Sequence, residues 1–136
     1  MNRPLVIDDA ARIVTPTETA ISPDGTQVVY VRSATVNGSP ISELWSVTDA
    51  EKPKRLTSGP HDLAPRWNAD GSELLFLRFV DGASQLFTLR AGGGEAEQLT
   101  TAKDLPLGAG AGVYSPDAKS VAFTAAVQIN THPGAS

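Results

Sequence analysis

Residues Ser22–Gly25 read Ser-Pro-Asp-Gly and lead directly into the mostly apolar run Thr26–Val31. The same arrangement recurs at Asn68–Gly71, which reads Asn-Ala-Asp-Gly, and at Ser115–Ala118, which reads Ser-Pro-Asp-Ala. The three aspartates are 46 and 47 residues apart. Proline presets the backbone for a type I turn, aspartate suits the next position, and glycine adopts the left-handed conformation that closes the hairpin. The spacing therefore predicts one hairpin that is repeated along the chain.

Two further elements recur at nearly the same period. Glu43–Val47, which reads Glu-Leu-Trp-Ser-Val, matches Gln85–Leu89 at a distance of 42 residues. Lys54–Thr57 matches Glu97–Thr100 at a distance of 43 residues. Because three elements recur in the same order, chance is a poor explanation for the repeat.

Each repeat is interpreted as four short strands joined by three tight turns. The dipeptides Asn37-Gly38 and Asp81-Gly82 favour hairpins between the second and third strands, and Asp49–Pro53 and Gly92–Gly94 separate the third and fourth. A four-stranded unit that recurs about every 40 to 50 residues is typical of a propeller blade. A β-sandwich of short strands is the alternative, but it does not require the same turn chemistry at a fixed period.

The sequence thus predicts an all-β fold, a partial β-propeller with about two and a half four-stranded antiparallel blades. Residues 1–19 are expected to form a lead-in with one short helix over Ile7–Val14. Blade one is expected at residues 20–58, blade two at 59–102, and an incomplete blade three at 103–136. In that third blade the second strand is expected at Val121–Ala126.

Composition narrows the class of protein. The chain has 136 residues, of which 40% are hydrophobic and 19% charged, and this balance is typical of a soluble globular domain. A net charge of −4 argues against nucleic acid or an anionic membrane as the main partner. Cysteine is absent, which excludes disulfides and thiolate metal sites and suits the reducing cytoplasm, where we expect the chain. No apolar run near Met1 has the length expected of a secretion signal.

The repeated Ser-Pro-Asp-Gly turns, followed by the Leu-Trp or Leu-Phe strand and then Arg-Leu-Thr or Gln-Leu-Thr, resemble the PD40 or TolB-like propeller repeat. That repeat is found in TolB proteins and in the propellers of prolyl oligopeptidase-family serine peptidases. The acidic lead-in, Thr15-Pro16 and the first Ser-Pro-Asp-Gly turn are similar to the start of the acylaminoacyl-peptidase and dipeptidyl-peptidase branch.

The resemblance implies a substrate-gating propeller that caps a C-terminal α/β-hydrolase domain and admits short peptides. It places the catalytic triad in that hydrolase domain, so the resemblance transfers no catalytic residue to this chain. The alternative is a non-catalytic TolB-like propeller that acts as a protein-interaction scaffold. Two positions depart from the repeat, because Ala69 replaces the turn proline and Ala118 replaces the turn glycine.

Motifs that could carry chemistry are better explained as structure. Ser84 lacks the second glycine of a nucleophile elbow and lies in a hairpin. The glycine-rich stretch Gly108–Gly112 lacks the lysine and hydroxyl of a phosphate-binding loop, so we interpret it as a flexible connection into blade three. His61 and His132 are 71 residues apart and have no neighbouring metal-type spacing.

The remaining candidates also have structural interpretations. The repeated turn aspartates, Asp24, Asp70 and Asp117, lack the dense oxygen ligands of a calcium loop. The large aromatic residues that recur along the repeats are expected to pack between blades; they are Trp45, Trp67 and Phe87. Asn37 fits a glycosylation pattern but is interpreted as a turn. The sequence therefore assigns no catalytic, cofactor-binding or metal-binding residue, and it predicts that the chain alone is not an enzyme.

Overall fold

A computed structural model describes residues 16–129, and within this range all regular structure is β-strand. The first sheet holds β1 (Pro16–Ile21), β2 (Gln27–Val36), β3 (Ser39–Thr48) and β4 (Lys54–Arg55). The second sheet holds β5 (Asp62–Trp67), β6 (Glu73–Val80), β7 (Ala83–Arg90) and β8 (Glu97–Gln98). A third sheet holds β9 (Ala109–Tyr114) and β10 (Val121–Ala125).

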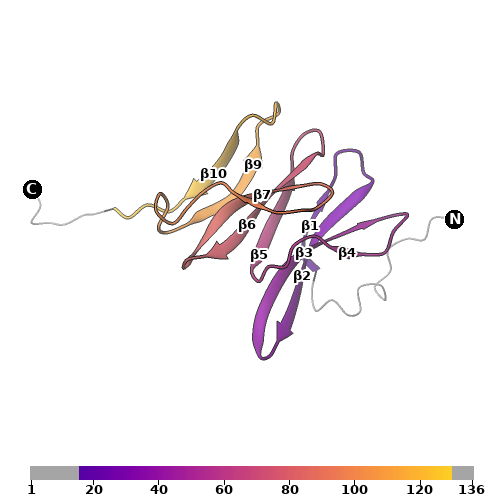
Figure 1. The fold of residues 1–136 in the computed structure, drawn as a ribbon. Coiled ribbons are helices and arrows are strands. Elements are labelled where there is room, and N and C mark those ends of the chain that lie inside the picture. Colours follow the sequence, from indigo (N-terminus) through magenta and orange to yellow (C-terminus); the bar gives the residue numbers. More distant parts are fainter. Residues whose placement is uncertain (1–15, 130–136) are drawn as a thin grey trace, which may run out of the picture.

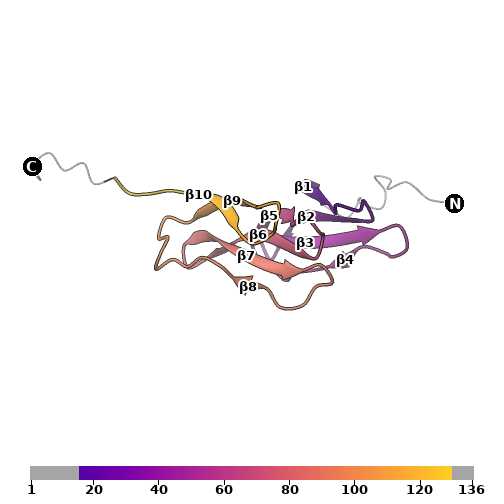
Figure 2. The ribbon, with the colours of Figure 1, turned by 90° about the horizontal axis from the view of Figure 1, so that it is seen from above.

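Every neighbouring pair of strands within the three sheets is antiparallel and follows chain order, so each sheet is a simple meander. The sheets lie side by side in chain order (Figure 1). Their first strands β1, β5 and β9 lie along one side of the molecule, and β4 and β8 lie along the other (Figure 2). The all-β fold and the partial propeller are therefore confirmed, and we call the three sheets blades one, two and three.

Some expected boundaries differ from the observed ones. Strand β1 begins at Pro16, inside the stretch expected to be lead-in. Its sequence could not predict the strand, because β-branched and charged residues there show no clear apolar alternation. The helix expected over Ile7–Val14 and the chain end 130–136 lie outside the described residues. Within residues 16–129, no helix exists that could cross a lipid bilayer.

The Ser-Pro-Asp-Gly turn forms the same hydrogen-bonded structure in blade one that its repeats form later. Asp24 Oδ1 accepts from the Ser22 hydroxyl at 2.7 Å and from the Thr26 amide at 3.0 Å. The Ser22 hydroxyl accepts from the Gln27 amide at 3.0 Å. In this way a carboxylate and a hydroxyl satisfy the backbone donors at the start of β2, which explains why these residue types recur.

The corresponding turns of blades two and three repeat these contacts. The amide of Ser72 donates to Asp70 Oδ1 at 2.9 Å, and the amide of Lys119 donates to Asp117 Oδ1 at 3.0 Å. The residue after each aspartate has a positive φ, and in the third turn that residue is Ala118, at 59°. The alanine at this position therefore adopts the left-handed conformation that glycine adopts in the other two turns.

Two cores hold the blades together. The larger core lies between blades one and two and contains buried aliphatic and aromatic side chains: Val29, Val31, Leu44, Leu56, Leu74, Phe76, Phe87 and Leu89. The smaller core lies between blades two and three and contains Leu75, Leu86 and Ala109. Alternate residues of β6 enter the two cores, so blade two is buried on both faces.

The glycine-rich stretch near the third blade is a strand, so its interpretation as a flexible connection is wrong. Most of it forms β9, and a side chain at Gly112 would approach the Leu75 side chain to 2.7 Å. A side chain at Gly108 would approach the Ser84 backbone oxygen to 2.8 Å. These glycines are needed because β9 packs closely against blade two, which leaves no room for a β-carbon.

Each first strand contains a bulge, and the three bulges lie within one residue of the same place in the repeat. Between Pro16 and Thr19, β1 has one residue more than the facing part of β2. The same irregularity lies between Leu63 and Arg66 in β5, where Ala64 has a φ of 56°. In the third blade it falls on β9, opposite the pair Phe123 and Ala125. A bulge of this kind bends and twists the strand that carries it.

Candidate functional site

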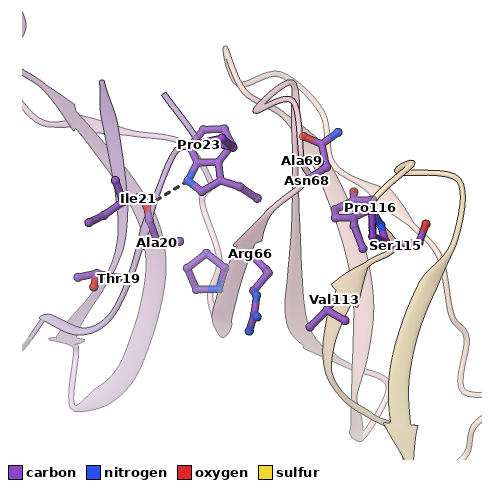
Figure 3. Close-up of a pocket in the computed structure, with 13 residues that line it drawn as sticks. Thr19, Ala20, Ile21, Pro23, Arg66, Asn68, Ala69, Val113, Ser115 and Pro116 are labelled. Carbon is purple, nitrogen blue, oxygen red and sulfur yellow. Dashed lines mark hydrogen bonds between the residues drawn. The ribbon is translucent and has the colours of Figure 1, made fainter. Parts of the chain in front are cut away.

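A groove of about 620 Å³ runs across the ends of the three first strands. It is lined by residues from the ends of β1, β5 and β9 and from the repeated hairpins that follow them: Thr19, Ala20, Ile21, Pro23, Pro65, Arg66, Trp67, Asn68, Ala69, Val113, Tyr114, Ser115 and Pro116. Figure 3 shows blade one on one side of the groove and blade three on the other. All three blades therefore contribute to one surface.

Among the described residues that line the groove, Arg66 alone has a charged side chain. Arg66 follows the bulge of β5, is exposed, and extends between the flanking blades (Figure 3). Within residues 16–129, no carboxylate lies within ion-pairing distance of its guanidinium. Proline, alanine and aliphatic side chains supply much of the remaining wall. Thr19, Asn68, Tyr114 and Ser115 add polar groups to the lining, so the arrangement suits an extended ligand that combines polar and apolar groups with one negative charge.

Aromatic residues at the ends of β5 and β9 connect each blade to the preceding one. The Trp67 indole Nε1 donates to the backbone oxygen of Ala20 at 3.0 Å, which joins blade two to blade one (Figure 3). The Tyr114 hydroxyl donates to Glu73 Oε2 at 3.1 Å, which joins blade three to blade two. Ile21 occupies the corresponding position in blade one, where 66% of its surface is exposed.

The electrostatics of these contacts follow from their surroundings. Burial, together with the negative charge of Glu73, raises the pKa of the Tyr114 hydroxyl above its ordinary value of 10.0. Tyr114 therefore keeps its proton at neutral pH and acts as a hydrogen-bond donor. Tyr114 thus adds no charge to the groove, and Arg66 is the only charged residue in its lining within residues 16–129.

The residues weighed for chemistry in the sequence lie apart from this groove. Ser84 lies in β7, next to Gly108, and has the regular strand surroundings of a hairpin. His61 stacks edge-on against Phe79, with ring centroids 6.3 Å apart, and pairs with β3 through Ser42. His132 lies outside the described residues.

The expected packing aromatics have different surroundings. Phe87 is buried and stacks on Phe76 at 5.7 Å, and Trp67 packs against the larger core. Trp45 instead lies on the far face of blade one, where the Arg32 guanidinium is 4.6 Å from its ring centroid. The turn aspartates bind backbone amides, and within residues 16–129 no group of three acidic, histidine or cysteine side chains clusters as a metal site.

Sequence reasoning missed the groove as a site. Its lining residues are far apart in the chain, so only the packing of three blades brings them together. One signal was available, because the residue directly before each repeated turn, at positions 21, 67 and 114, changes from isoleucine to tryptophan to tyrosine. An aligned repeat would have shown large side chains at the same corner of each blade.

Two curated relatives are peptidases. The chain is 35% identical to the uncharacterized peptidase YuxL of Bacillus subtilis across 91% of its own length and 19% of that protein. It is 30% identical to dipeptidyl-peptidase 5 of Porphyromonas endodontalis across 81% of its length and 16% of that protein. The chain therefore spans less than a fifth of the length of either relative.

The fold comparison points to TolB. The structure of TolB from Acinetobacter baumannii matches 82% of this chain and 26% of that protein, with a TM-score of 0.60 and 24% sequence identity. At this identity the match shows the fold. No family model matches the chain. The chain therefore has the fold of part of the TolB β-propeller, and it is related in sequence to part of longer peptidases.

Proposed function

We propose that this chain forms part of the N-terminal propeller of a longer serine peptidase resembling acylaminoacyl peptidase, in which it docks and gates short peptides. The observation that carries the proposal is the similarity to two peptidases over 91% and 81% of the chain, combined with the propeller fold. In this proposal an α/β-hydrolase domain, outside these residues, supplies the catalytic groups.

The groove supports a docking role. In a propeller the first strand of each blade faces the central channel, so Arg66 and Val113 would line the path of a ligand through it. The mixed polar and apolar walls suit the backbone and side chains of an extended peptide, and Arg66 suits a carboxylate at its end or on a side chain. A rim charge of this kind selects ligands and guides their approach.

The test uses the longer protein with matched peptide substrates that end in a free carboxylate or in an amide. We expect Arg66→Gln to lower kcat/KM about tenfold for the carboxylate substrate and to leave the amide substrate nearly unchanged. Arg90→Gln, at the exposed end of β7 and outside the groove lining, is the matched control. Equal effects on both substrates would show that Arg66 does not bind the substrate carboxylate.

The second candidate function is a non-catalytic TolB-like scaffold, and the fold match to TolB supports it. A serine-directed phosphonate distinguishes this scaffold from the peptidase. The longer protein should react with the phosphonate, and its peptide hydrolysis should stop. The 136-residue chain alone should show no phosphonate-sensitive turnover of an ester above a protein-free blank. A longer protein that is inert to the phosphonate would exclude the peptidase and leave the scaffold.

A further inference from the structure

In blade two, Arg78 lies between a buried carboxylate, Asp62, and an aromatic ring, Phe87, and the three side chains form one unit. Arg78 on β6 donates from Nε to Asp62 Oδ1 at 2.7 Å, and its second terminal nitrogen donates to Asp62 Oδ2 at 3.0 Å. The Arg78 guanidinium also lies 4.9 Å from the ring centroid of Phe87. The side chain of Asp62 has no exposed surface, so its charge depends on the arginine.

Blade one contains the same unit without the carboxylate. Strand register pairs Asp62 with Arg78 in blade two, and it pairs Pro16 with Arg32 at the corresponding place in blade one. The aromatic member is retained, because the Arg32 guanidinium lies 4.6 Å from the ring centroid of Trp45. Blade one therefore keeps the arginine and the aromatic ring but has proline at the position of the acid.

Blade three has no charged residue at the two positions of the acid and the arginine. The corresponding pair in its register is Ala109 with Ala125, so the acid and the base are both replaced there. Blade two has both charges at this pair and blade three has neither, whereas blade one has the arginine without an acid at the first-strand position. This comparison makes Arg32 the unmatched member of the series.

The atom that lacks a partner is the one that makes the bond in blade two. Nε of Arg32 is buried and has no hydrogen-bond partner among residues 16–129, and a buried charged donor in that state is destabilising. Glu43 faces Arg32 across the β2–β3 pair. Its carboxylate already accepts from the Trp45 indole at 3.1 Å and pairs with Arg55 at 3.6 Å.

The position of Arg32 indicates what supplies the missing acid. Arg32 corresponds in register to Arg78, whose neighbours Leu74 and Phe76 belong to the face of blade two that packs on blade one. The face of blade one that carries Arg32 is therefore equivalent to an interface between blades. The peptidase relatives are long enough to supply another blade, because the chain spans 19% and 16% of their lengths.

We propose that Arg32 and Trp45 form a carboxylate-binding site, filled in the longer protein by an aspartate or glutamate of a further blade that packs on this face. The acid binds Nε of Arg32 as Asp62 binds Nε of Arg78. The site locks two blades together across the face of blade one that carries Arg32. This inference concerns assembly of the propeller and holds whether or not the longer protein is a peptidase.

The first test supplies the acid within the 136-residue chain. Pro16→Asp places a carboxylate at the register position of Asp62, and Pro16→Asn is the neutral control that removes the same proline. We expect the melting midpoint of Pro16→Asp to exceed that of Pro16→Asn by about 4 °C. The difference should vanish in an Arg32→Met background, and its persistence there would overturn the proposal.

The second test uses the sign of the Arg32→Met effect. In the 136-residue chain this change removes a guanidinium whose buried Nε has no hydrogen-bond partner among residues 16–129, so the melting midpoint should stay level or rise. In the longer protein it leaves a buried acid alone, so the midpoint should fall by about 4 °C or more. Arg78→Met, the matched control, should lower the midpoint in both proteins.

Two outcomes of this second test would contradict the proposal. An Arg32→Met variant that is equally stable in both proteins would show that no further blade supplies an acid. Self-association of the 136-residue chain that Arg32→Met abolishes, measured by light scattering, would identify a second copy as the partner and overturn the assignment to a further blade.

Discussion

The indole nitrogen of Trp67, at the end of β5, lies 3.0 Å from the backbone oxygen of Ala20 in β1, and this hydrogen bond joins two blades beside the groove. We expect Trp67→Phe to lower the free energy of unfolding by about 1 kcal/mol, because the ring remains while the donor is lost. Chemical denaturation of the purified chain measures the change. A variant as stable as the parent would show that water replaces this donor without loss.

The third repeated turn contains a strained residue. Ala118 has a φ of 59°, at the position where Gly25 and Gly71 have 75°. Ala118→Gly should raise the free energy of unfolding by about 1 kcal/mol, because glycine adopts this conformation without a steric cost. The reverse change, Gly25→Ala, meets no atom within 4 Å and should lower stability by a similar amount through the backbone alone.

The turn aspartates make stability depend on acid pH. Hydrogen bonds from Thr26 and Ser22 lower the pKa of Asp24 from 3.8 to about 2, and similar bonds lower the pKa values of Asp70 and Asp117. A carboxyl whose folded pKa is depressed stabilises the fold above its unfolded pKa and loses that contribution as pH falls through the folded value. Stability should therefore decline between about pH 4 and about pH 2.

The control for this pH effect is a chain in which Asp24 alone is replaced by asparagine. Its melting midpoint should change less between pH 4 and pH 2 than that of the parent, because one titrating group has been removed. Thermal melting at constant ionic strength gives both curves. Parallel curves would mean that the Asp24 turn has no part in the acid response.

The second strand of blade three is an edge strand. Within residues 16–129, β10 pairs only with β9, and its residue Phe123 is 41% exposed. We expect the 136-residue chain to associate as its concentration rises, and Phe123→Lys to weaken that association, because a lysine on an edge strand opposes pairing with another chain. Light scattering coupled to size exclusion provides the measurement.

Val36→Lys serves as the matched control for the edge. Val36 is also exposed, at 48%, but it ends β2, which lies between β1 and β3 inside blade one. This variant should associate like the parent chain. If both lysine variants reduce association equally, general charge rather than the β10 edge is responsible.

The turns and strand order could be predicted from the sequence because their chemistry is local. Asp24 Oδ1 accepts from the hydroxyls of Ser22 and Thr26 and from the Thr26 amide, all within two residues, so the same short motif builds the same turn wherever it occurs. Asn37 and Asp81 show the same locality, since both adopt positive φ values in the hairpins expected for them.

The groove and the close packing of β9 could not be predicted in this way. Gly112 was interpreted by composition, whereas its actual constraint is the side chain of Leu75 on another sheet. Likewise, the sequence does not distinguish Arg66 from the other arginines. Its role in the groove depends on β1 and β9, which lie on either side of it. Both features depend on contacts between blades, and no spacing within one repeat encodes them.

The bulge in each first strand has a consequence for how such a protein can change over time. The extra residue, near Ala64 in β5, belongs to the same continuous stretch as the strands and turn of its own blade. Duplication of one such stretch would therefore carry its bend with it, and so would deletion. Lineages could thus gain or lose whole blades in single genetic events, while each remaining blade keeps its internal geometry.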